Sequence, residues 1–402
     1  MKGVKKNNHK PIPVIFLHPH FTLPGGAGRM ALEIAHRLNP LKYKVYMLCI
    51  YAAPEYKQYF PNIRFVELGG PLSSQFSFWL RWIWLQIKIH NYLNQFDHLI
   101  LFPHVFPANW WAFIYTLWHP HVPCIWLCQE PSAFIHYRAW INSISSPLMK
   151  FWVKLCNPLL KAIDMFLVAR SADYLFCNSV YSAGEIQKIY KRSDAIVAYP
   201  GVDLSLFNEA KCKKNIILTV GLLTRFKQVH LIIEAMRFIH DEDMILIIVG
   251  DGEDKGRLID LAQKGGLNQR VKFFTGITDQ QLAQLYGQAK IFVLASLYEP
   301  FGMVAAEALA CGTPVIGHNG GGLKEIVQDK HNGILLNELT PQTIASAIDT
   351  MLKNPEMHER LMQNARFSVM HFNWEQSVSK VEEIIDLISH AKAAPIGFDD
   401  NP

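Results

Sequence analysis

The sequence predicts an α/β protein with two doubly wound domains, each built on a parallel β-sheet. Three observations support this prediction. The chain has 402 residues, which is long enough for two domains of ordinary size. Short runs rich in β-branched residues alternate with helical patterns along the chain. In the second half, each run ends in Gly, Ser or Asp where the next helix is expected to begin.

The predicted strands fall into two groups, which define a first domain over residues 1–207 and a second over 208–374. The boundary follows a Pro-Gly turn, after which charged residues precede the next strand. A helix over 375–392 is expected to pack back on the first domain, with 393–402 as a loose tail. The cleft between the domains is the expected ligand site. The strands are expected at 12–18, 43–50, 98–104, 123–129, 172–179, 215–221, 244–250, 271–276, 290–296 and 313–317.

Composition excludes several classes of protein. Half of the residues are hydrophobic, so the chain is neither disordered nor fibrous. No run of about 18 apolar residues occurs, and we therefore expect no membrane span. The apolar run 12–17 contains Pro13 and lacks a cleavage site, which indicates a first strand rather than a signal peptide. Seven cysteines without zinc or redox spacing indicate reduced, mostly buried thiols of a cytoplasmic protein.

Charge is unevenly distributed between the two halves. Residues 1–210 carry a net charge of +9 and residues 211–402 a net charge of −4, and nine of the ten tryptophans lie in the first half. Basic and aromatic side chains together suit peripheral contact with an anionic membrane. A Trp-rich core with a solvated basic rim is the alternative, and the sequence leaves both open. Nothing indicates a nucleic-acid partner.

The stretch "YEPFGMVAAEALACGTPVIG" places two carboxylates, Glu299 and Glu307, in an otherwise apolar run. Pro300 places Glu299 in the loop at the carboxyl end of a buried strand, and Glu307 then lies about one turn inside the following helix. The free N–H groups at this helix start form an expected site for anionic oxygens. Carboxylates on both sides of such a site suit a nucleotide sugar; two solvated carboxylates bracketing a core helix are the alternative. The N–H groups belong to Phe301, Gly302, Met303 and Val304.

This stretch resembles the E-x7-E segment of the group 1 retaining glycosyltransferases with the GT-B fold, in which two Rossmann-like domains face a cleft. "EPFGMVAAEALACGTPVI" agrees nearly end to end, and the resemblance extends from about Pro13 to Ile385. It implies that Glu299 faces the donor sugar hydroxyls and that Glu307 holds the ribose hydroxyls. It also implies that the amides of residues 301–304 meet the sugar and the phosphate.

A second stretch, "TVGLLTRFKQVHLIIEAM", resembles the loop where this family places an Arg and a Lys on the donor diphosphate. Lys227 falls on the Lys position. Leu222 stands where the Arg usually follows the Gly, and Arg225 is the expected substitute from the same loop. Such cations stabilise the charge on the leaving nucleoside diphosphate without a metal. A solvated Arg and Lys pair is the alternative.

Weaker resemblances add glycines and one loop residue to the donor site. Gly250 lies in a tight turn that permits close backbone approach to the nucleotide, and Ile277 is expected to contact the base through its backbone. Gly25 and Gly26 belong to a turn similar to the family's "GGAER" start, where donor phosphate and acceptor come close. Gly28 stands where a Glu is more usual, and we expect it on the acceptor side.

Four residues of the first half are candidates for the sugar or acceptor side. His104 lies in "LFPHVFPANWWA", which resembles a stretch of bacterial members. Gln129 stands where the family's "YCHEPPR" stretch has a His, and a Gln can still donate to a sugar hydroxyl. Glu130 and His136 are expected to compensate for that change. A satisfied or surface histidine is the alternative for His136.

The resemblance implies a metal-independent, retaining hexosyltransferase without a cofactor. GDP-mannose is the first expected donor and a UDP-sugar the second; the acceptor is a glycan or a lipid-linked saccharide of surface polysaccharide or lipopolysaccharide synthesis. This implies a cytoplasmic location, at the inner face of the inner membrane. Two alternatives stay open: a sugar-nucleotide epimerase or phosphorolytic enzyme on the same scaffold, and a scaffold relative without activity because of Leu222 and Gln129.

Overall fold

The N-terminal lobe is built on a twisted parallel sheet in the computed structural model, which describes residues 10–22, 25–70, 75–137, 141, 147–210 and 212–393. Strands β5, β3, β1 and β6 lie in this order, and a parallel bridge from Leu101 to Cys124 continues them into β7, β8 and β9. Residues 14–17 of the central strand are completely buried, as expected for a strand covered on both faces. The strands are β1 (Ile12–Leu17), β2 (His20–Phe21), β3 (Tyr43–Cys49), β4 (Tyr51–Ala52), β5 (Arg64–Glu67), β6 (Ile100–Pro103), β7 (Ile125–Leu127), β8 (Tyr174–Cys177) and β9 (Ile196–Val197).

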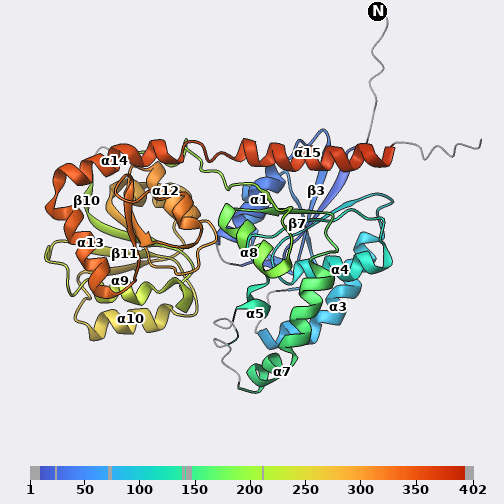
Figure 1. Cartoon of the computed structure of the whole chain (residues 1–402), viewed down its shortest axis with the longest axis horizontal. Coiled ribbons are helices and arrows are strands. Elements are labelled where there is room, and N and C mark those ends of the chain that lie inside the picture. Colours follow the sequence, from blue (N-terminus) through green and yellow to red (C-terminus); the bar gives the residue numbers. More distant parts are fainter. Residues whose placement is uncertain are drawn as a thin grey trace, which may run out of the picture.

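Helices connect and cover these strands (Figure 1). Most are amphipathic elements that bury one face on the sheet, and Ser179 caps α8 by accepting a hydrogen bond from the Ser182 amide. The helices of this lobe are α1 (Gly26–Arg37), α2 (Pro54–Tyr59), α3 (Gln75–Leu93), α4 (Ala108–Trp118), α5 (Ala133–His136), α7 (Pro147–Ile163), the π-helix η1 (Asp164–Val168) and α8 (Val180–Tyr190).

The C-terminal lobe has a parallel sheet in the order β12, β11, β10, β13, β14 and β15. In chain order this is 3-2-1-4-5-6, the order of a dinucleotide-binding sheet, and the predicted fold class of two Rossmann-like domains is confirmed. Its elements are β10 (Lys214–Val220), η2 (Arg225–Lys227), α9 (Val229–Ala235), β11 (Ile245–Val249), α10 (Lys255–Lys264), β12 (Val271–Phe274), α11 (Asp279–Gln288), β13 (Ala289–Leu294), α12 (Met303–Ala310), β14 (Val315–His318), η3 (Gly321–Glu325), β15 (Gly333–Leu336), α13 (Pro341–Lys353) and α14 (Pro355–Val369).

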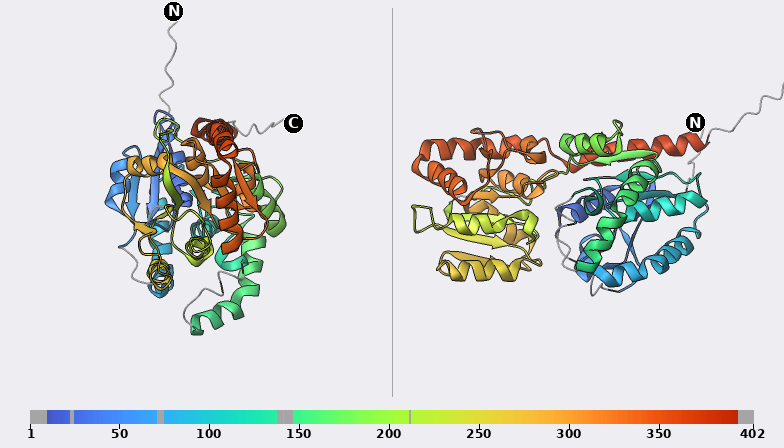
Figure 2. Two further views of the ribbon diagram at one scale, coloured as in Figure 1. Left: turned by 90° about the vertical axis from the view of Figure 1, so that its left-hand side faces the viewer. Right: turned by 60° about the horizontal axis from the view of Figure 1, so that its bottom comes forward.

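The last helix, α15 (Trp374–Ala393), returns from the C-terminal lobe and lies along the N-terminal lobe (Figure 1, Figure 2). Val381 and Ile385 are completely buried in the same hydrophobic core as β1 and β3. The chain passes from one lobe to the other near Gly201 and returns near Trp374. These two connecting segments are in contact, because a Cβ on Gly201 would come within 2.3 Å of the Trp374 nitrogen. The two segments therefore form one joint. Residues 394–402 of the expected tail lie outside the described part of the chain.

Polar contacts also join the lobes beside this joint. The Glu325 carboxylate, from η3, accepts hydrogen bonds from the amides of Val180 and Tyr181 at 2.9 and 2.8 Å. A carboxylate of one lobe thus caps a helix of the other. The Ser179 hydroxyl donates to the Pro300 carbonyl at 2.6 Å, next to Glu299.

The structure contains strand at each of the ten predicted positions and adds weaker ones. Strands β5 and β15 are edge strands whose residues are mostly half-buried. Each has only four residues, and so short a run does not distinguish a strand from other structure by its pattern, which explains why the sequence did not reveal them. In the part of the chain that the structure describes, no helix is both long and apolar enough to cross a membrane.

Candidate functional site

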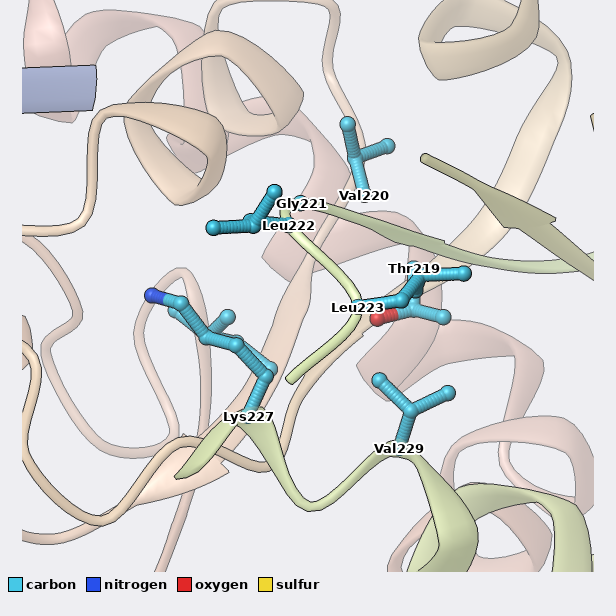
Figure 3. Close-up of a pocket in the computed structure, with 8 residues that line it drawn as sticks. Thr219, Val220, Gly221, Leu222, Leu223, Lys227 and Val229 are labelled. Carbon is cyan, nitrogen blue, oxygen red and sulfur yellow. The ribbon is translucent and has the colours of Figure 1, made fainter. Parts of the chain in front are cut away.

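The loop after β10 places an ammonium group at the carboxyl end of the C-terminal sheet. Lys227 lies at the end of the short helix η2, and its Nζ donates to Glu299 Oε2 at 2.7 Å. Figure 3 shows the side chains of Lys227 and Leu222 extending in the same direction from this loop, which lines a small pocket. Ligands of open α/β sheets bind at this edge. Lys227 and Glu299, 72 residues apart, thus meet in one site.

The backbone around Glu299 is held by a glycine turn. The Gly322 amide donates to the Glu299 carbonyl at 2.8 Å. A Cβ on Gly322 would lie 2.1 Å from the Pro300 carbonyl oxygen, and Gly321 has a positive φ of 65°. Only glycine permits this approach. These glycines of "GHNGGGLKEIV" therefore position the loop that carries Glu299.

Two helix starts approach each other across the lobes near this carboxylate. Gly302 precedes α12 with a φ of 106°, and Phe301 beside it is buried. A Cβ on Gly26, at the start of α1, would lie 3.6 Å from Met303 Sδ, at the start of α12. The first N–H groups of a helix have no acceptor inside the helix, and both helix dipoles present their positive ends here. The arrangement can stabilise an anion between the lobes.

Glu307 lies inside α12 and is almost completely buried. Its Oε2 accepts from the Tyr286 hydroxyl at 3.0 Å, and its Oε1 lies 3.5 Å from Arg29 Nη1 of the other lobe. Burial raises the pKa of Glu307 above its usual value, while Arg29 and Tyr286 lower it. A second carboxylate, Asp279, lies 3.7 Å from Arg29. Arg29 thus forms an ion-pair link between the lobes.

Glu130 is the fourth carboxylate of the site. It follows β7, and its charge interacts with those of Lys227 and Glu299. Burial raises the pKa of Glu130 to about 7; Glu299 acts in the same direction and Lys227 against it. A carboxyl that titrates near neutrality beside an ion pair can hold or release a proton at working pH.

The prediction that His104 lies at the sugar side of the site was wrong, because this residue is buried. His104 has no exposed surface; its two ring nitrogens lie 2.8 Å from His18 Nδ1 and 2.8 Å from Gln129 Nε2. Burial lowers the pKa of His104 to about 3, so the ring is neutral. Gln129 Nε2 also donates to the Ala27 carbonyl at 3.2 Å. Gln129 therefore holds the turn that begins α1, and His104 contacts Gln129 from the interior of the lobe.

His136 also has a structural environment that differs from the expected compensating role. Its Nε2 lies 2.9 Å from Asp164 Oδ2, inside the N-terminal lobe. Asp164 is completely buried and also accepts from Tyr190 and Trp110. This network satisfies the histidine, which is the alternative given above for His136. In this structure it does not line the site.

The remaining candidate glycines differ in what a Cβ at each position would contact. A Cβ on Gly25 would meet no atom within 4 Å, and its φ of −154° is open to any residue, so nothing in the folded chain requires glycine there. Gly28 instead packs against Phe21. Gly250 has a φ of 151°, and a Cβ would lie 1.9 Å from the Gly221 carbonyl oxygen. The close approach that Gly250 permits is therefore to the protein's own backbone.

Three further candidates for the donor site are Arg225, Val304 and Ile277. Arg225 is exposed at the start of η2, two residues before Lys227. Val304 and Ile277 are partly buried and pack against the hydrophobic core of the C-terminal lobe. The structure gives the Arg225 side chain no hydrogen bond to a described residue of the site, and Val304 and Ile277 are expected to act through their backbone. The expected donor contacts of all three remain predictions.

Both halves of the chain match glycosyltransferase families. Residues 205–367 match the family described as Glycosyl transferases group 1, and residues 24–206 match the one described as Glycosyltransferase Family 4. By these matches the C-terminal lobe is a group 1 glycosyltransferase domain and the N-terminal lobe a Glycosyltransferase Family 4 domain. The boundary between the two matches falls in the joint between the lobes, so each lobe corresponds to one family domain.

The chain resembles curated glycosyltransferases over part of their length. It is 35% identical over 164 residues to an uncharacterised glycosyltransferase of Methanocaldococcus jannaschii, which covers 40% of this chain and 42% of the relative. It is 29% identical over 253 residues to a D-inositol 3-phosphate glycosyltransferase of Streptomyces bingchenggensis, covering 57% of this chain and 56% of that protein. The matched region spans about half the length of these relatives.

Solved structures resemble the fold of nearly the whole chain. The protein HepE of Anabaena, in complex with UDP and glucose, has a TM-score of 0.76 at 19% identity, covering 94% of this chain and 100% of that one. A sucrose-phosphate synthase of Thermosynechococcus elongatus has a TM-score of 0.77 at 21% identity with the same coverage. At these identities the likeness concerns the fold, which is GT-B.

Several residues of the candidate site were not found by sequence reasoning. They are the side chains that tie Glu307 in place: Arg29, Tyr286 and, through Arg29, Asp279. Arg29 directly follows the glycine turn, and a lone cation at that position was the only signal. The partner carboxylate lies 278 residues further along the chain, and local pattern cannot reveal such a pairing.

Proposed function

We propose that the protein transfers a hexose from a nucleotide diphosphate sugar to an acceptor hydroxyl, with retention of the anomeric configuration and without a metal ion. The carrying observation is the Lys227 to Glu299 contact of 2.7 Å beside two converging helix starts. This arrangement offers a fixed cation and free N–H groups to the diphosphate and a carboxylate to the sugar.

Each group has a defined part in the proposed reaction. The bond between sugar C1 and the phosphate oxygen breaks, and the acceptor oxygen bonds to C1 on the same face. The acceptor proton passes to the leaving phosphate oxygen, so atoms and charge balance without a protein base. Lys227 and the α12 N–H groups stabilise the leaving diphosphate, Glu299 orients the sugar hydroxyls, and Glu307 accepts from the ribose.

The donor in this proposal is GDP-mannose first and a UDP-sugar second. GDP-mannose rests on the resemblance of the GGAGR, PHVFPANW, CQEP and YPGVD segments to bacterial mannosyltransferases. The HepE structure of similar fold is described in complex with UDP-glucose, which is why the second donor belongs in the same test.

The acceptor in this proposal is a glycan or a lipid-linked saccharide presented at the cytoplasmic face of a membrane. The excess of basic and Trp residues in the first 210 residues supports this choice. The relative described as a D-inositol 3-phosphate glycosyltransferase makes a small polyol phosphate the competing acceptor class.

A thermal-shift panel of GDP, UDP, ADP and their sugar conjugates tests the donor site. Wild type and Glu307→Gln are compared, since Gln keeps the shape of the side chain but its amide nitrogen cannot accept a hydrogen bond. A ligand at 100 times its dissociation constant stabilises by about 2.7 kcal/mol. One nucleotide should raise the melting temperature of the wild type, and it should raise the melting temperature of the variant by less. No shift with any nucleotide contradicts the donor assignment and favours the scaffold alternative.

Product analysis with the best donor then tests the chemistry. NMR of the new glycosidic bond should show the donor's anomeric configuration, and the rate should be unchanged in EDTA. An inverted product contradicts retention, and loss of activity in EDTA contradicts metal independence. Release of an epimerised sugar nucleotide instead of a glycoside would support the epimerase alternative.

A further inference from the structure

Helix α7 of the N-terminal lobe exposes an apolar stripe. Its members recur at helical spacing, so they share one face of the helix. The π-helix η1 continues the face directly after α7. Exposed apolar side chains are ordinary when single, but a continuous stripe marks an interaction surface. The stripe consists of Leu148, Trp152, Leu155, Leu159 and Phe166, each more than half exposed.

The opposite side of this segment is fastened to the lobe. Asn157 donates to the Ile135 carbonyl at 2.8 Å. Asp164, where α7 passes into η1, accepts from the Trp110 and Tyr190 side chains at 2.6 and 2.8 Å. Figure 1 and the left view of Figure 2 show α7 projecting at the lower extremity of the N-terminal lobe. The stripe is therefore displayed on a fixed support.

The exposed charges on this segment are of one sign. From residue 141 to residue 172 the sequence contains a single acidic residue, Asp164, and that side chain is completely buried. Lys154 and Arg170 are exposed, and Lys161 is partly exposed. The surface that this segment offers is thus apolar with a basic rim. This pattern complements an anionic lipid surface, since lysine and arginine meet the headgroups while leucine and tryptophan enter below them.

We propose that α7 and η1 dock the enzyme on an anionic bilayer, with the apolar stripe at headgroup depth and the helix in the plane of the membrane. The binding of vesicles follows from this segment alone. Delivery of a lipid-linked acceptor to the cleft by this docking rests on the proposed function.

Vesicle flotation of the full chain tests the docking. Vesicles of phosphatidylglycerol and phosphatidylcholine are compared with vesicles of phosphatidylcholine alone. The triple variant Trp152→Ser, Leu155→Gln, Leu159→Gln should reduce the fraction bound to anionic vesicles by about tenfold or more. Lys154→Gln with Lys161→Gln should reduce it less and remove most of its salt dependence. The double variant Leu41→Gln, Phe367→Gln is the matched control, because both side chains are highly exposed but lie elsewhere.

The outcomes separate this proposal from the proposed function. Normal thermal shifts with the nucleotide in the triple variant show that the fold and the donor site are intact. Flotation of the wild type with loss in the triple variant supports docking, whether or not any transfer is detected. Equal flotation of the wild type and the triple variant, or no flotation of the wild type, overturns it. A wild-type dimer that the triple variant abolishes, without vesicle binding, also overturns it and would show that a second copy covers the stripe.

Discussion

Arg29 Nη1 of the N-terminal lobe lies 3.5 Å from Glu307 Oε1 of the C-terminal lobe. Glu307 is the carboxylate proposed to hold the donor ribose. Under that proposal, the donor and the ion pair that links the lobes share one carboxylate, so donor binding would act on the link between the lobes. The same guanidinium lies 3.7 Å from Asp279, which accepts from the Tyr59 hydroxyl at 3.0 Å.

Replacing Arg29 by Gln should destabilise the protein in a pH-dependent manner. Arg29 lowers the raised pKa of the buried Glu307, so its removal raises that pKa further above the unfolded value. At acid pH the Glu307 carboxyl is protonated in both the folded and the unfolded state. The loss in the free energy of unfolding should therefore grow as the pH rises, to about 1–2 kcal/mol near neutrality. Melting temperatures at acid and neutral pH measure it. Arg37→Gln, which breaks a pair on the same helix with Glu33, is the control; an equal loss at both pH values contradicts the link.

Lys227→Met should lower donor turnover far more than Arg225→Met. Lys227 contacts Glu299 and lines the pocket, whereas Arg225 is exposed. Loss of one fixed charge at a leaving group costs about 10²–10³ in rate. We expect this loss for Lys227 and less than about tenfold for Arg225, measured as kcat/KM for donor hydrolysis or transfer. Equal losses would mean that Arg225 serves the diphosphate as well.

Leu222→Arg should strengthen nucleoside diphosphate binding. The Leu222 side chain extends in the same direction as that of Lys227 (Figure 3) and is partly exposed, so an Arg fits without burial. One added charge-assisted hydrogen bond should lower the dissociation constant by about tenfold. Isothermal titration of the nucleotide checks this, with Leu222→Gln as the uncharged control. An unchanged affinity would place the diphosphate away from this loop.

Gly25→Ala and Gly250→Ala should have opposite consequences. A Cβ on Gly25 meets nothing within 4 Å, so the melting temperature should stay constant while donor binding weakens by about tenfold, if phosphate approaches this turn. A Cβ on Gly250 would lie 1.9 Å from a carbonyl oxygen, so Gly250→Ala should cost more than about 2 kcal/mol of stability. Melting curves and nucleotide titrations of both variants suffice. Unaltered donor affinity in Gly25→Ala would show that the turn at Gly25 does not contact the donor.

Donor affinity should fall as the pH rises through about 7, because the pKa of Glu130 is raised to about 7 by burial. Below this value the carboxyl is neutral; above it, the charge repels the donor diphosphate. A nucleotide sugar has no titrating phosphate in this range, so Glu130→Gln should bind it with a flatter pH profile. Titrations in buffers of different ionisation enthalpy should show proton uptake by the wild type alone. The same profile in both proteins would exclude Glu130 as the titrating group.

Local pattern was sufficient for the fold and for residues whose role follows from the backbone. Short runs rich in β-branched residues, alternating with helical patterns, revealed both sheets, and the segment from Glu299 to Gly312 revealed a loop followed by a helix start. Pairings of side chains were not predictable in this way. The burial of His104 behind Gln129 and the contact of Arg29 with Glu307 arise from chain segments that only tertiary packing brings together.

The return of α15 onto the first lobe has a consequence for biosynthesis. Val381 and Ile385 complete the core that contains β1, so the lobe translated first lacks part of its interior until the last helix leaves the ribosome. Domains generally fold as they emerge, in order from the N-terminus. Here the lobe made second can fold first, and a chain truncated near residue 370 and released from the ribosome should carry an unfinished, chaperone-binding first lobe beside a finished second one.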